Sequence, residues 1–301
     1  MQKIVKLAAP ERGLFVSGSS VFARPICMSK TKDTLSDPVK GINLHGGPYH
    51  FNKLELLIKT DENISVFSSE IDEAREWALA EGCIEKLDQI ILNLTGRHSS
   101  KVFTSLSSPL LMGVVNVTPD SFYDGGKNSK AQTAISQAHR LIADGVDIID
   151  IGGESSKPGA VPVTAEQEIE RVIPVIKEVS GFGVPISIDT QKSSVMEAAV
   201  IAGASIVNDI SALSADPKSL RLLRELGVPV ILMHMQGTPV DMQNNPYYQF
   251  APLDILEYLR NRIDVCLESG ISLSNIIVDL GIGFGKNLNH NVAILNRLSL
   301  F

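Results

Sequence analysis

The stretch LLMGVVNVTPDSFYDGG, residues 110–126, decides the fold of this chain. Its first part is apolar and rich in valine, as in a buried strand, and the run stops abruptly at Asn116. A polar loop with a proline and a Gly-Gly pair follows. Apolar residues then recur at helical spacing from Ala131 to Ile142, so we predict a strand, a loop and a helix in succession.

The same succession is repeated along the rest of the chain. Strands are predicted at Leu110–Val117, Val146–Ile151, Val184–Ile188, Ser205–Asp209, Pro229–His234 and Asn275–Leu280. Amphipathic helices lie between them, for instance at residues 168–179, and such alternation is typical of a parallel sheet covered by helices. The strands are almost continuously apolar, which indicates that both faces of the sheet are buried.

An open doubly wound sheet and a (β/α)₈ barrel both fit this α/β pattern. The barrel is favoured because every strand, and not only one switch-point pair, ends in polar residues. We count six βα units, the last of which ends in a helical pattern at residues 292–301. The predicted barrel is therefore incomplete.

Composition and charge exclude several classes of protein. Of the 301 residues, 44% are hydrophobic and 20% charged, which is ordinary for a soluble globular protein. The net charge of −7 argues against non-specific nucleic-acid binding, although a local basic pocket for an anionic substrate is compatible with it. Three widely spaced cysteines indicate neither a disulfide framework nor a zinc site. Because the chain has no apolar run of about 18 residues and no signal sequence, we expect a cytoplasmic protein.

Residues 1–108 differ in texture from the rest, and we predict that they form a small α+β N-terminal extension. A polar, serine-rich linker at residues 96–108 marks the boundary. The second domain, residues 109–301, holds the barrel. The sequence assigns no chemistry to the extension.

Within the extension, residues 51–59 fit a strand or a helix equally well. Residues 69–94 favour one helix, which Ser69 would cap. Three histidines invite a metal interpretation, but no acidic or thiol partner lies at ligand spacing around them. We interpret them as surface residues: His45, His50 and His98.

The residues that close the predicted barrel strands are polar and alike in type. In chain order they are Asn116, the loop 152–159, Asp189, Asn208, His234 and Asp279. Because the carboxyl ends of parallel strands meet at one face of a barrel, we expect them to converge. Carboxylates and carboxamides suit a flat heterocycle with several N–H donors and ring acceptors. Glycine-rich loops with Lys157 and Lys286 suit a phosphate group.

Each element alone also has an ordinary structural explanation. Asp189 would serve as a helix cap, and Asn208 as a turn residue. The glycines at 281–285 match half of a dinucleotide fingerprint, but its acidic ribose partner would fall at or beyond the chain end, so we reject that interpretation. His234, between two methionines, is more typical of a packed residue than of a base. These explanations do not account for the shared chemistry of five separate strand ends.

Six stretches resemble the successive signatures of the dihydropteroate synthases. They occur in that family's order and at its spacing: NVTPDSFYDGG (116–126), DIGGESSKPGA (150–160), ISIDT (186–190), VNDIS (207–211), LMHMQGTP (232–239) and DLGIGFGK (279–286). The resemblance covers residues 110–301 and implies a (β/α)₈ barrel of the pterin-binding type. It also implies a transferase of folate biosynthesis, which condenses 7,8-dihydropterin-6-ylmethyl diphosphate with 4-aminobenzoate to give 7,8-dihydropteroate and diphosphate.

The resemblance assigns roles to individual residues. Asp189, Asn208 and Asp279 would grip the pterin, with Asp189 and Asp279 as the catalytic residues. Asn116 would hold the Mg²⁺ that rides on the diphosphate. The loops at 118–128 and 154–160 would close over the site and shape the aminobenzoate pocket. The other substrate-binding residues implied are Ser156, Lys157, Met233, Phe284 and Lys286.

The implied chemistry needs no nucleophilic side chain. If diphosphate leaves first, a pterin-stabilised cation remains, and a buried carboxylate offsets its charge. Magnesium and basic groups neutralise the departing anion. The implied partners are the small-molecule substrates, with neither nucleic acid nor membrane, and a possible homodimer.

Three departures from the family pattern bear on activity. Lys157 stands where the family has arginine, which loses a planar fork, and Leu280 stands where it has proline, which loosens the turn. The family's last two strands, with their Ser-Arg-Lys and Arg-x-His segments, are absent. We therefore expect little or no synthase activity from residues 1–301 alone, and open sheet edges that promote aggregation or dimerisation. The alternatives are a non-catalytic remnant, or another pterin-binding barrel such as a methyltetrahydrofolate-dependent methyltransferase domain.

Overall fold

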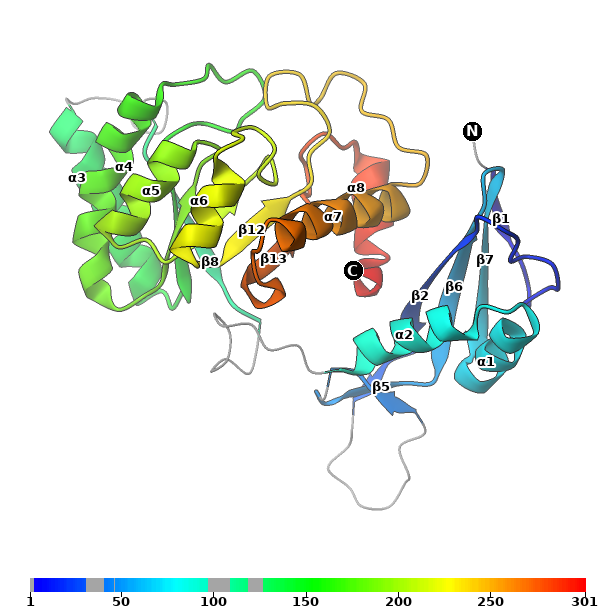
Figure 1. Ribbon diagram of the computed structural model, residues 1–301. Coiled ribbons are helices and arrows are strands. Elements are labelled where there is room, and N and C mark those ends of the chain that lie inside the picture. Colours follow the sequence, from blue (N-terminus) through cyan, green and yellow to red (C-terminus); the bar gives the residue numbers. More distant parts are fainter. Residues whose placement is uncertain (1–2, 31–40, 46, 97–108, 119–126) are drawn as a thin grey trace. The chain divides into compact units, whose positions relative to one another are not determined.

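The computed structural model describes residues 3–30, 41–45, 47–96, 109–118 and 127–301 (Figure 1). The chain divides into two compact units. One unit consists of Met1–His98 together with Ala293–Phe301, and the other is Ser99–Val292. The linker predicted at residues 96–108 lies almost wholly outside the described residues, so the exact domain boundary stays a prediction.

The second unit, which we call the barrel unit, is built on a six-stranded sheet in which all the strands are parallel. The strand order is β13-β12-β11-β10-β9-β8, so each strand lies beside its neighbour in the chain. The strands are β8 (Met112–Asn116), β9 (Ile148–Gly152), β10 (Ile186–Asp189), β11 (Ile206–Asp209), β12 (Val230–Met233) and β13 (Ile276–Asp279). All six predicted strands are confirmed.

Helices connect these strands and cover the outer face of the sheet (Figure 1). They are α3 (Lys127–Ala143), α4 (Ala165–Val179), α5 (Ser193–Ala202), α6 (Ser219–Leu226), α7 (Ala251–Glu268) and α8 (Leu288–Leu295), with short 3₁₀ turns η2 (Ser180–Phe182) and η3 (Leu273–Asn275). A capping box at Thr164 explains why α4 begins at Ala165. The Thr164 side chain accepts from the backbone of Gln167, whose own side chain accepts from the backbone of Thr164.

Successive side chains of each strand face opposite sides of the sheet, so its two faces pack differently, as β9 illustrates. Ile149 and Ile151 point outward and pack against the helices. Ile148 points to the inner face, where it meets isoleucines of β11 and β12. Asp150 and Gly152 share that inner side, because successive residues of a strand face opposite ways. The inner face is therefore apolar at the amino end of the strands and polar at their carboxyl end.

The first unit is a four-stranded sheet in the order β1-β7-β6-β2, backed by two helices. Its strands are β1 (Lys3–Lys6), β2 (Ser20–Ile26), β6 (Lys53–Lys59) and β7 (Asn63–Glu70); the helices are α1 (Ile71–Ala80) and α2 (Ile84–Thr95). A small sheet of β3 (Ser29–Lys30), β5 (Tyr49–Phe51) and β4 (Ile42–Asn43) accompanies them. Leu56 and Phe67 pack with Trp77 and Leu87 of the helices.

The end of the chain completes this unit. The 3₁₀ turn η4 (Leu298–Leu300) lies against β2, and the Ser299 hydroxyl donates to the Pro25 carbonyl at 3.2 Å. Glu55 of β6 accepts from two arginines, Arg24 at 2.7 Å and Arg297 at 3.1 Å. The three side chains are largely shielded from solvent, so their charges interact more strongly than a surface pair.

Two expectations for the first unit are settled by the structure. Residues 53–59 form a strand, which decides between the two alternatives for that stretch. The single helix expected at residues 69–94 is wrong, because Ser69 closes β7 and a turn at Gly82, with φ +73°, separates α1 from α2. A left-handed residue cannot continue a helix, and glycine adopts that conformation without strain.

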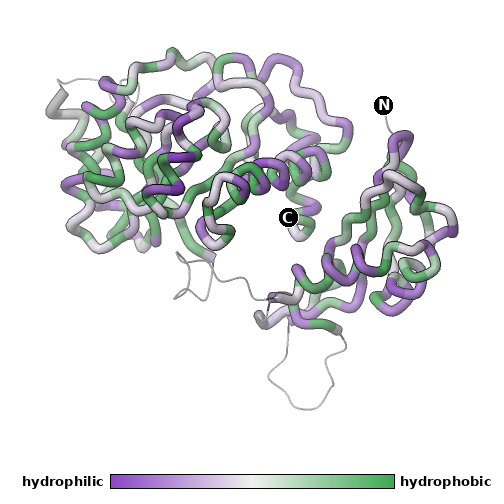
Figure 2. Tube along the Cα trace, viewed as in Figure 1, coloured by the Kyte–Doolittle hydropathy of each residue, from purple (hydrophilic) through white to green (hydrophobic). Residues whose placement is uncertain are grey.

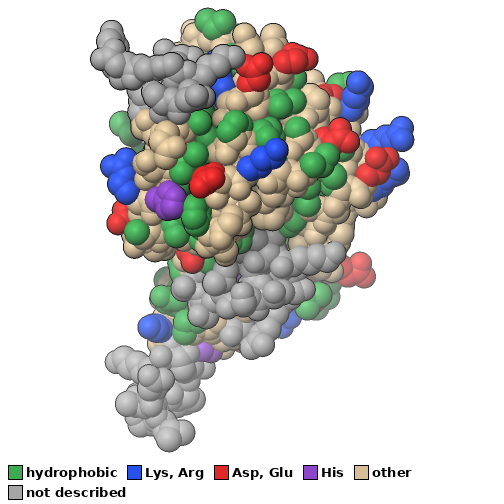
Figure 3. Space-filling model, turned by 90° about the vertical axis from the view of Figure 1, so that its left-hand side faces the viewer, with side chains coloured by type: hydrophobic (Ala, Val, Ile, Leu, Met, Phe, Trp, Pro, Cys, Tyr) green, Lys and Arg blue, Asp and Glu red, His purple; other side chains and the backbone are tan. Residues whose placement is uncertain are grey.

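The distribution of polarity matches the burial pattern. The strands of both units are predominantly hydrophobic along the trace (Figure 2). On the face seen in Figure 3, acidic and basic side chains of the described residues are interspersed and not gathered by sign. In the part of the chain that the structure describes, no helix is both long and apolar enough to span a membrane.

Candidate active site

The carboxyl ends of the parallel strands bring most of the predicted site residues to one edge of the sheet. In the strand register Asn116 pairs with Gly152, Gly152 with Asp189, and Asp189 with Asn208. Asp279 pairs with Met233 at the other end of the sheet. The strand ends from Asn116 to Asn208 therefore form one row, with Asn116 exposed at its β8 end. This row continues through Ile231 and Ile277, and Asp279 lies two residues beyond it along β13.

A second polar layer lies next to this row, on the inner face of the sheet. Asp150 is only 5% exposed and accepts from the Asn208 amide group at 3.2 Å. Its register neighbour Ser187 is fully buried. Within the described residues, one oxygen each of Asp150 and Asn208 is buried and has no hydrogen-bond partner. Because buried polar atoms normally find partners, these oxygens are suited to N–H groups of a ligand.

Burial shapes the electrostatics of this layer. Loss of water raises the pKa of Asp150, and the nearby Asp279 carboxylate raises it further. The pKa of Asp189 lies well above its usual value, because of burial first and then of the negative charge of Asp150 and Glu168. Carboxylates crowded in this way are relieved by a ligand that donates hydrogen bonds or acquires positive charge.

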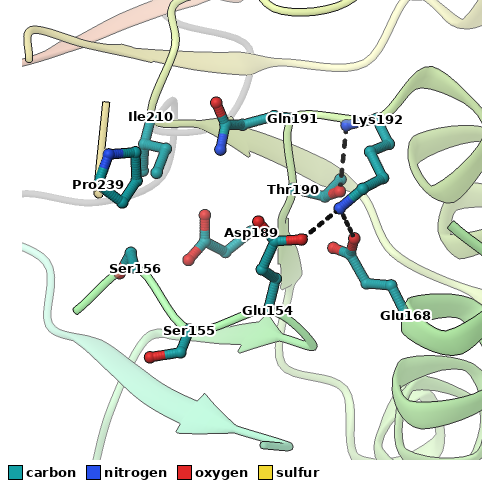
Figure 4. Close-up of a pocket in the computed structure, with 10 residues that line it drawn as sticks. All are labelled: Glu154, Ser155, Ser156, Glu168, Asp189, Thr190, Gln191, Lys192, Ile210 and Pro239. Carbon is teal, nitrogen blue, oxygen red and sulfur yellow. Dashed lines mark hydrogen bonds and ion pairs between the residues drawn. The ribbon is translucent and has the colours of Figure 1, made fainter. Parts of the chain in front are cut away.

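A small cleft opens beside Asp189 (Figure 4). Its walls come from the loop after β9, from α4, from the turn between β10 and α5, and from two later loops. It is lined by Glu154, Ser155, Ser156, Glu168, Asp189, Thr190, Gln191, Lys192, Ile210 and Pro239. Ser156 thus lines the cleft, whereas Lys157 is exposed and does not.

Lys286 serves the loop that follows β13. Its ammonium group is buried and donates to the carbonyls of Gly281 at 2.8 Å, Phe284 at 2.9 Å and His234 at 3.1 Å. Nδ1 of His234 lies 3.0 Å from the same Nζ atom. With its donors directed at protein acceptors, Lys286 does not fit the predicted phosphate-holding role. It fixes the loop around Asp279, whose carboxylate accepts from the Gly281 amide at 2.8 Å.

The neighbouring histidine is neutral at physiological pH. Burial, and then the positive charge of Lys286, lowers the pKa of His234 to about 3. Burial also lowers the pKa of Lys286 to about 8. His234 is 5% exposed and packs against Tyr258, with ring centroids 4.8 Å apart, so it is a packed residue as the sequence indicated.

The sequence-based selection missed three site residues. Asp150 and Ser187 were quoted within motifs but given no role, although their period-2 alternation with outward-facing isoleucines could have placed them inside the barrel. Lys192 was also missed. It is bonded to Glu154 and Glu168, and no sequence spacing reveals that pairing.

Asn116 is the predicted ligand of the magnesium ion. Among the described residues, no three histidine, cysteine or acidic side chains gather as a metal-binding group. The Asn116 carboxamide lies at the end of β8, close to Gly152, and it is exposed. A hard cation that keeps several waters requires few protein ligands, so this amide oxygen fits Mg²⁺ as a single ligand. The neighbouring residues 119–126 lie outside the described residues.

Comparisons with known proteins agree with this geometry. The model of the pterin binding enzyme family matches residues 112–301. The dihydropteroate synthase of Neisseria meningitidis serogroup B is 47% identical over 197 residues, which cover 64% of this chain and 69% of that protein.

Solved structures show the same relationship. A Xanthomonas albilineans dihydropteroate synthase with 4-aminobenzoic acid gives a TM-score of 0.60 at 43% identity, over 64% of this chain and 68% of that one. The same organism's enzyme in complex with 7,8-dihydropteroate gives 0.57 at 40% identity, with the same shares covered. This chain therefore belongs to the dihydropteroate synthase family of pterin-binding enzymes.

Proposed function

We propose that this chain carries the site that condenses 7,8-dihydropterin-6-ylmethyl diphosphate with 4-aminobenzoate, giving 7,8-dihydropteroate and diphosphate. The observation that carries the proposal is the row of strand-end acceptors around Asp150, Asp189 and Asn208, with its unsatisfied buried oxygens. The two Xanthomonas albilineans structures, named for 4-aminobenzoic acid and 7,8-dihydropteroate, support the same substrates. The direct test is binding, because little turnover is expected from residues 1–301 alone: the protein should bind a pterin analogue and 4-aminobenzoate together, and a protein that binds neither would contradict the proposal.

Recognition of the pterin follows from the polarity of the site. A pterin presents an exocyclic amine and ring N–H groups along one edge, and the inner layer offers carboxylate and carboxamide oxygens. The Asn208 amide is oriented by Asp150, because its nitrogen donates to that carboxylate and its oxygen is left for the ligand. Asp279 approaches from the other side of the site, held by the Gly281 amide.

The same carboxylates favour the reaction. When diphosphate leaves, positive charge develops on the pterin, and it is offset by carboxylates that were already desolvated in the free protein. Because this attraction is greatest in the transition state, it lowers the barrier and does not merely tighten substrate binding. The aminobenzoate amine then attacks from the cleft beside Asp189, where Ser155 and Ser156 line the wall. When bound at Asn116, Mg²⁺ would neutralise charge on the leaving diphosphate.

Replacement of Asp279 by alanine is expected to weaken binding of a pterin analogue by about 2–4 kcal/mol, the scale for removing one partner of a buried charged hydrogen bond. Calorimetric titration measures it. Asp279→Asn is the matched control, because it keeps an acceptor for the Gly281 amide and removes only the charge. Unchanged affinity in Asp279→Ala, together with unchanged affinity in Asn208→Ala, would remove both residues from the pterin site.

Replacement of Asn116 by alanine is expected to reduce Mg²⁺-dependent diphosphate binding about tenfold or more, as loss of a metal-site contact commonly does, while free pterin binds as before. Asn116→Asp keeps an oxygen ligand and should retain the magnesium dependence. Titrations of diphosphate with and without Mg²⁺ provide the measurement. If diphosphate and pterin binding fall together, Asn116 supports the fold and holds no metal.

A further inference from the structure

Lys192 is the only basic residue among the ten that line the cleft, in a wall that also carries three carboxylates (Figure 4). Its ammonium group donates to Glu154 at 2.5 Å and to Glu168 at 2.7 Å. Glu168 is completely buried, whereas Lys192 and Glu154 keep about a quarter and a fifth of their side chains exposed. The three residues are not a surface ion pair, because one carboxylate has no access to water at all.

The three charged groups join three separate segments of the chain. Glu154 belongs to the loop after β9, Glu168 to α4, and Lys192 to the turn between β10 and α5. The Glu154 oxygen bound by Lys192 also accepts the backbone N–H of Val163 at 3.2 Å. This bond closes the loop of residues 154–163 at its base, and Lys192 ties that base to the segment that presents Asp189.

We propose that Lys192 is a positioning residue that holds the loop of residues 154–163, and with it Ser155 and Ser156, in place for the second substrate. The inference rests on the proposed function for the identity of that substrate, an aromatic amine with a carboxylate. Lys192 touches neither reacting atom and acts through Glu154. Its side chain reaches from the Asp189 turn, so it sets the spacing between the pterin side and the loop side of the cleft.

Electrostatics supports a single arrangement of these groups. Without the lysine, Glu154, Glu168 and Asp189 would share one cleft wall with no compensating positive charge. Glu154 is the only one of the three on a loop, and like charges repel, so it would move away into solvent. Glu168 cannot follow because α4 is packed into the core of the unit. Loss of Lys192 would therefore open the loop before it unfolds the barrel unit.

The test compares Lys192→Met with Lys192→Arg and with the double variant Lys192→Met/Glu168→Gln. In the double variant no uncompensated charge is left at the buried position, so a loss of folding is separated from a loss of positioning. Lys177→Met is the control, since Lys177 is an exposed lysine on α4. For each variant the dissociation constant for 4-aminobenzoate, measured with a pterin analogue present, the affinity for the pterin analogue and the thermal midpoint are measured.

For Lys192→Met and for the double variant, the dissociation constant for 4-aminobenzoate is expected to rise about tenfold or more, as misplacement of a positioning segment does. Pterin affinity should change less than about threefold, and arginine should restore most of the loss because it keeps both ion pairs. The inference is overturned if the constant for 4-aminobenzoate stays at its original value. It is also overturned if every loss of affinity is accompanied by a fall in the thermal midpoint and is absent from the double variant.

A readout without catalysis separates this inference from the proposed function. Hydrogen exchange of the Val163 amide, which bonds to Glu154, should accelerate about tenfold or more in Lys192→Met and remain unchanged in Lys177→Met. A protein that binds neither the pterin analogue nor 4-aminobenzoate but shows this acceleration would contradict the proposed function and leave the positioning role supported. Unchanged exchange in Lys192→Met would overturn the positioning role, whatever the activity.

Discussion

Replacing Gly281 by alanine is expected to destabilise the barrel unit by about 2–5 kcal/mol. Gly281 has φ +61°, and a Cβ atom there would stand 2.0 Å from the carbonyl oxygen of His234. That oxygen belongs to the chain just after β12 and also accepts from Lys286, so it cannot retreat without disturbing the strand end. The left-handed conformation costs roughly 1–2 kcal/mol in an alanine, and forcing an atom into packed structure adds about 1–3 kcal/mol.

Denaturant unfolding of the two glycine variants measures this effect. Gly283→Ala is the matched control, because Gly283 has φ +87° but no atom within 4 Å of an added Cβ. It should cost only the conformational part, about 1–2 kcal/mol. Equal losses in the two variants would mean that the contact with His234 is relieved cheaply. The loop after β13 would then be less firmly fixed than Lys286 suggests.

Replacing Asp189 by asparagine is expected to stabilise the protein and to impair its binding site. Burial and the neighbouring carboxylates raise the pKa of Asp189 well above its usual value, so the ionised side chain opposes folding at neutral pH. Asparagine occupies the same space without charge. We expect a gain of roughly 1–2 kcal/mol in the free energy of unfolding, the scale of a common single stabilising substitution. Pterin affinity should fall by about 2–4 kcal/mol.

The pH dependence identifies the cause. A carboxyl group with a raised folded-state pKa holds its proton in the fold, so stability is fully present below the unfolded value of 3.8 and is lost as pH rises through the folded value. The advantage of Asp189→Asn should therefore be largest near neutral pH and vanish in acid. Thermal midpoints between about pH 4 and pH 8 follow this difference.

Asp216 provides a control of opposite sign. Burial alone would raise its pKa, but hydrogen bonds from Ser193 and from the amide of Lys218 outweigh this and lower the pKa. Such a group adds stability above pH 3.8 and loses it as the pH falls, so Asp216→Asn should destabilise the protein at neutral pH. If both aspartates respond in the same direction, side-chain volume and not charge dominates at Asp189.

The strands of the barrel unit could be predicted because local sequence and global fold agree there. Each is a short, mostly apolar run, and four of the six end in a polar side chain, as in Ile206–Asp209. The first unit lacks such agreement. Ser69 has the chemistry of a helix cap, yet it pairs with Leu54 in the sheet, and tertiary pairing overrides its local preference.

The site was predictable as far as it depends on strand ends. Asn208 and Asp189 follow from that rule, and their register confirms that they are neighbours. Lys286 does not, since its burial depends on carbonyls turned inward by a glycine-rich loop. Lys192 is 38 residues from Glu154 and 24 from Glu168, so their meeting is a property of the folded chain.

Residues 293–301 belong to the first unit, and this affects the order in which the two units can finish folding. Glu55 and Arg297 are 242 residues apart, and the whole barrel unit is synthesised between them. As the chain leaves the ribosome, β2 and β6 emerge early. Of the two arginines that bind Glu55, only Arg24 is present at that stage. Contacts of such long separation form slowly, and domains usually fold as they emerge. The first unit thus cannot be completed before residues 99–292 have been synthesised.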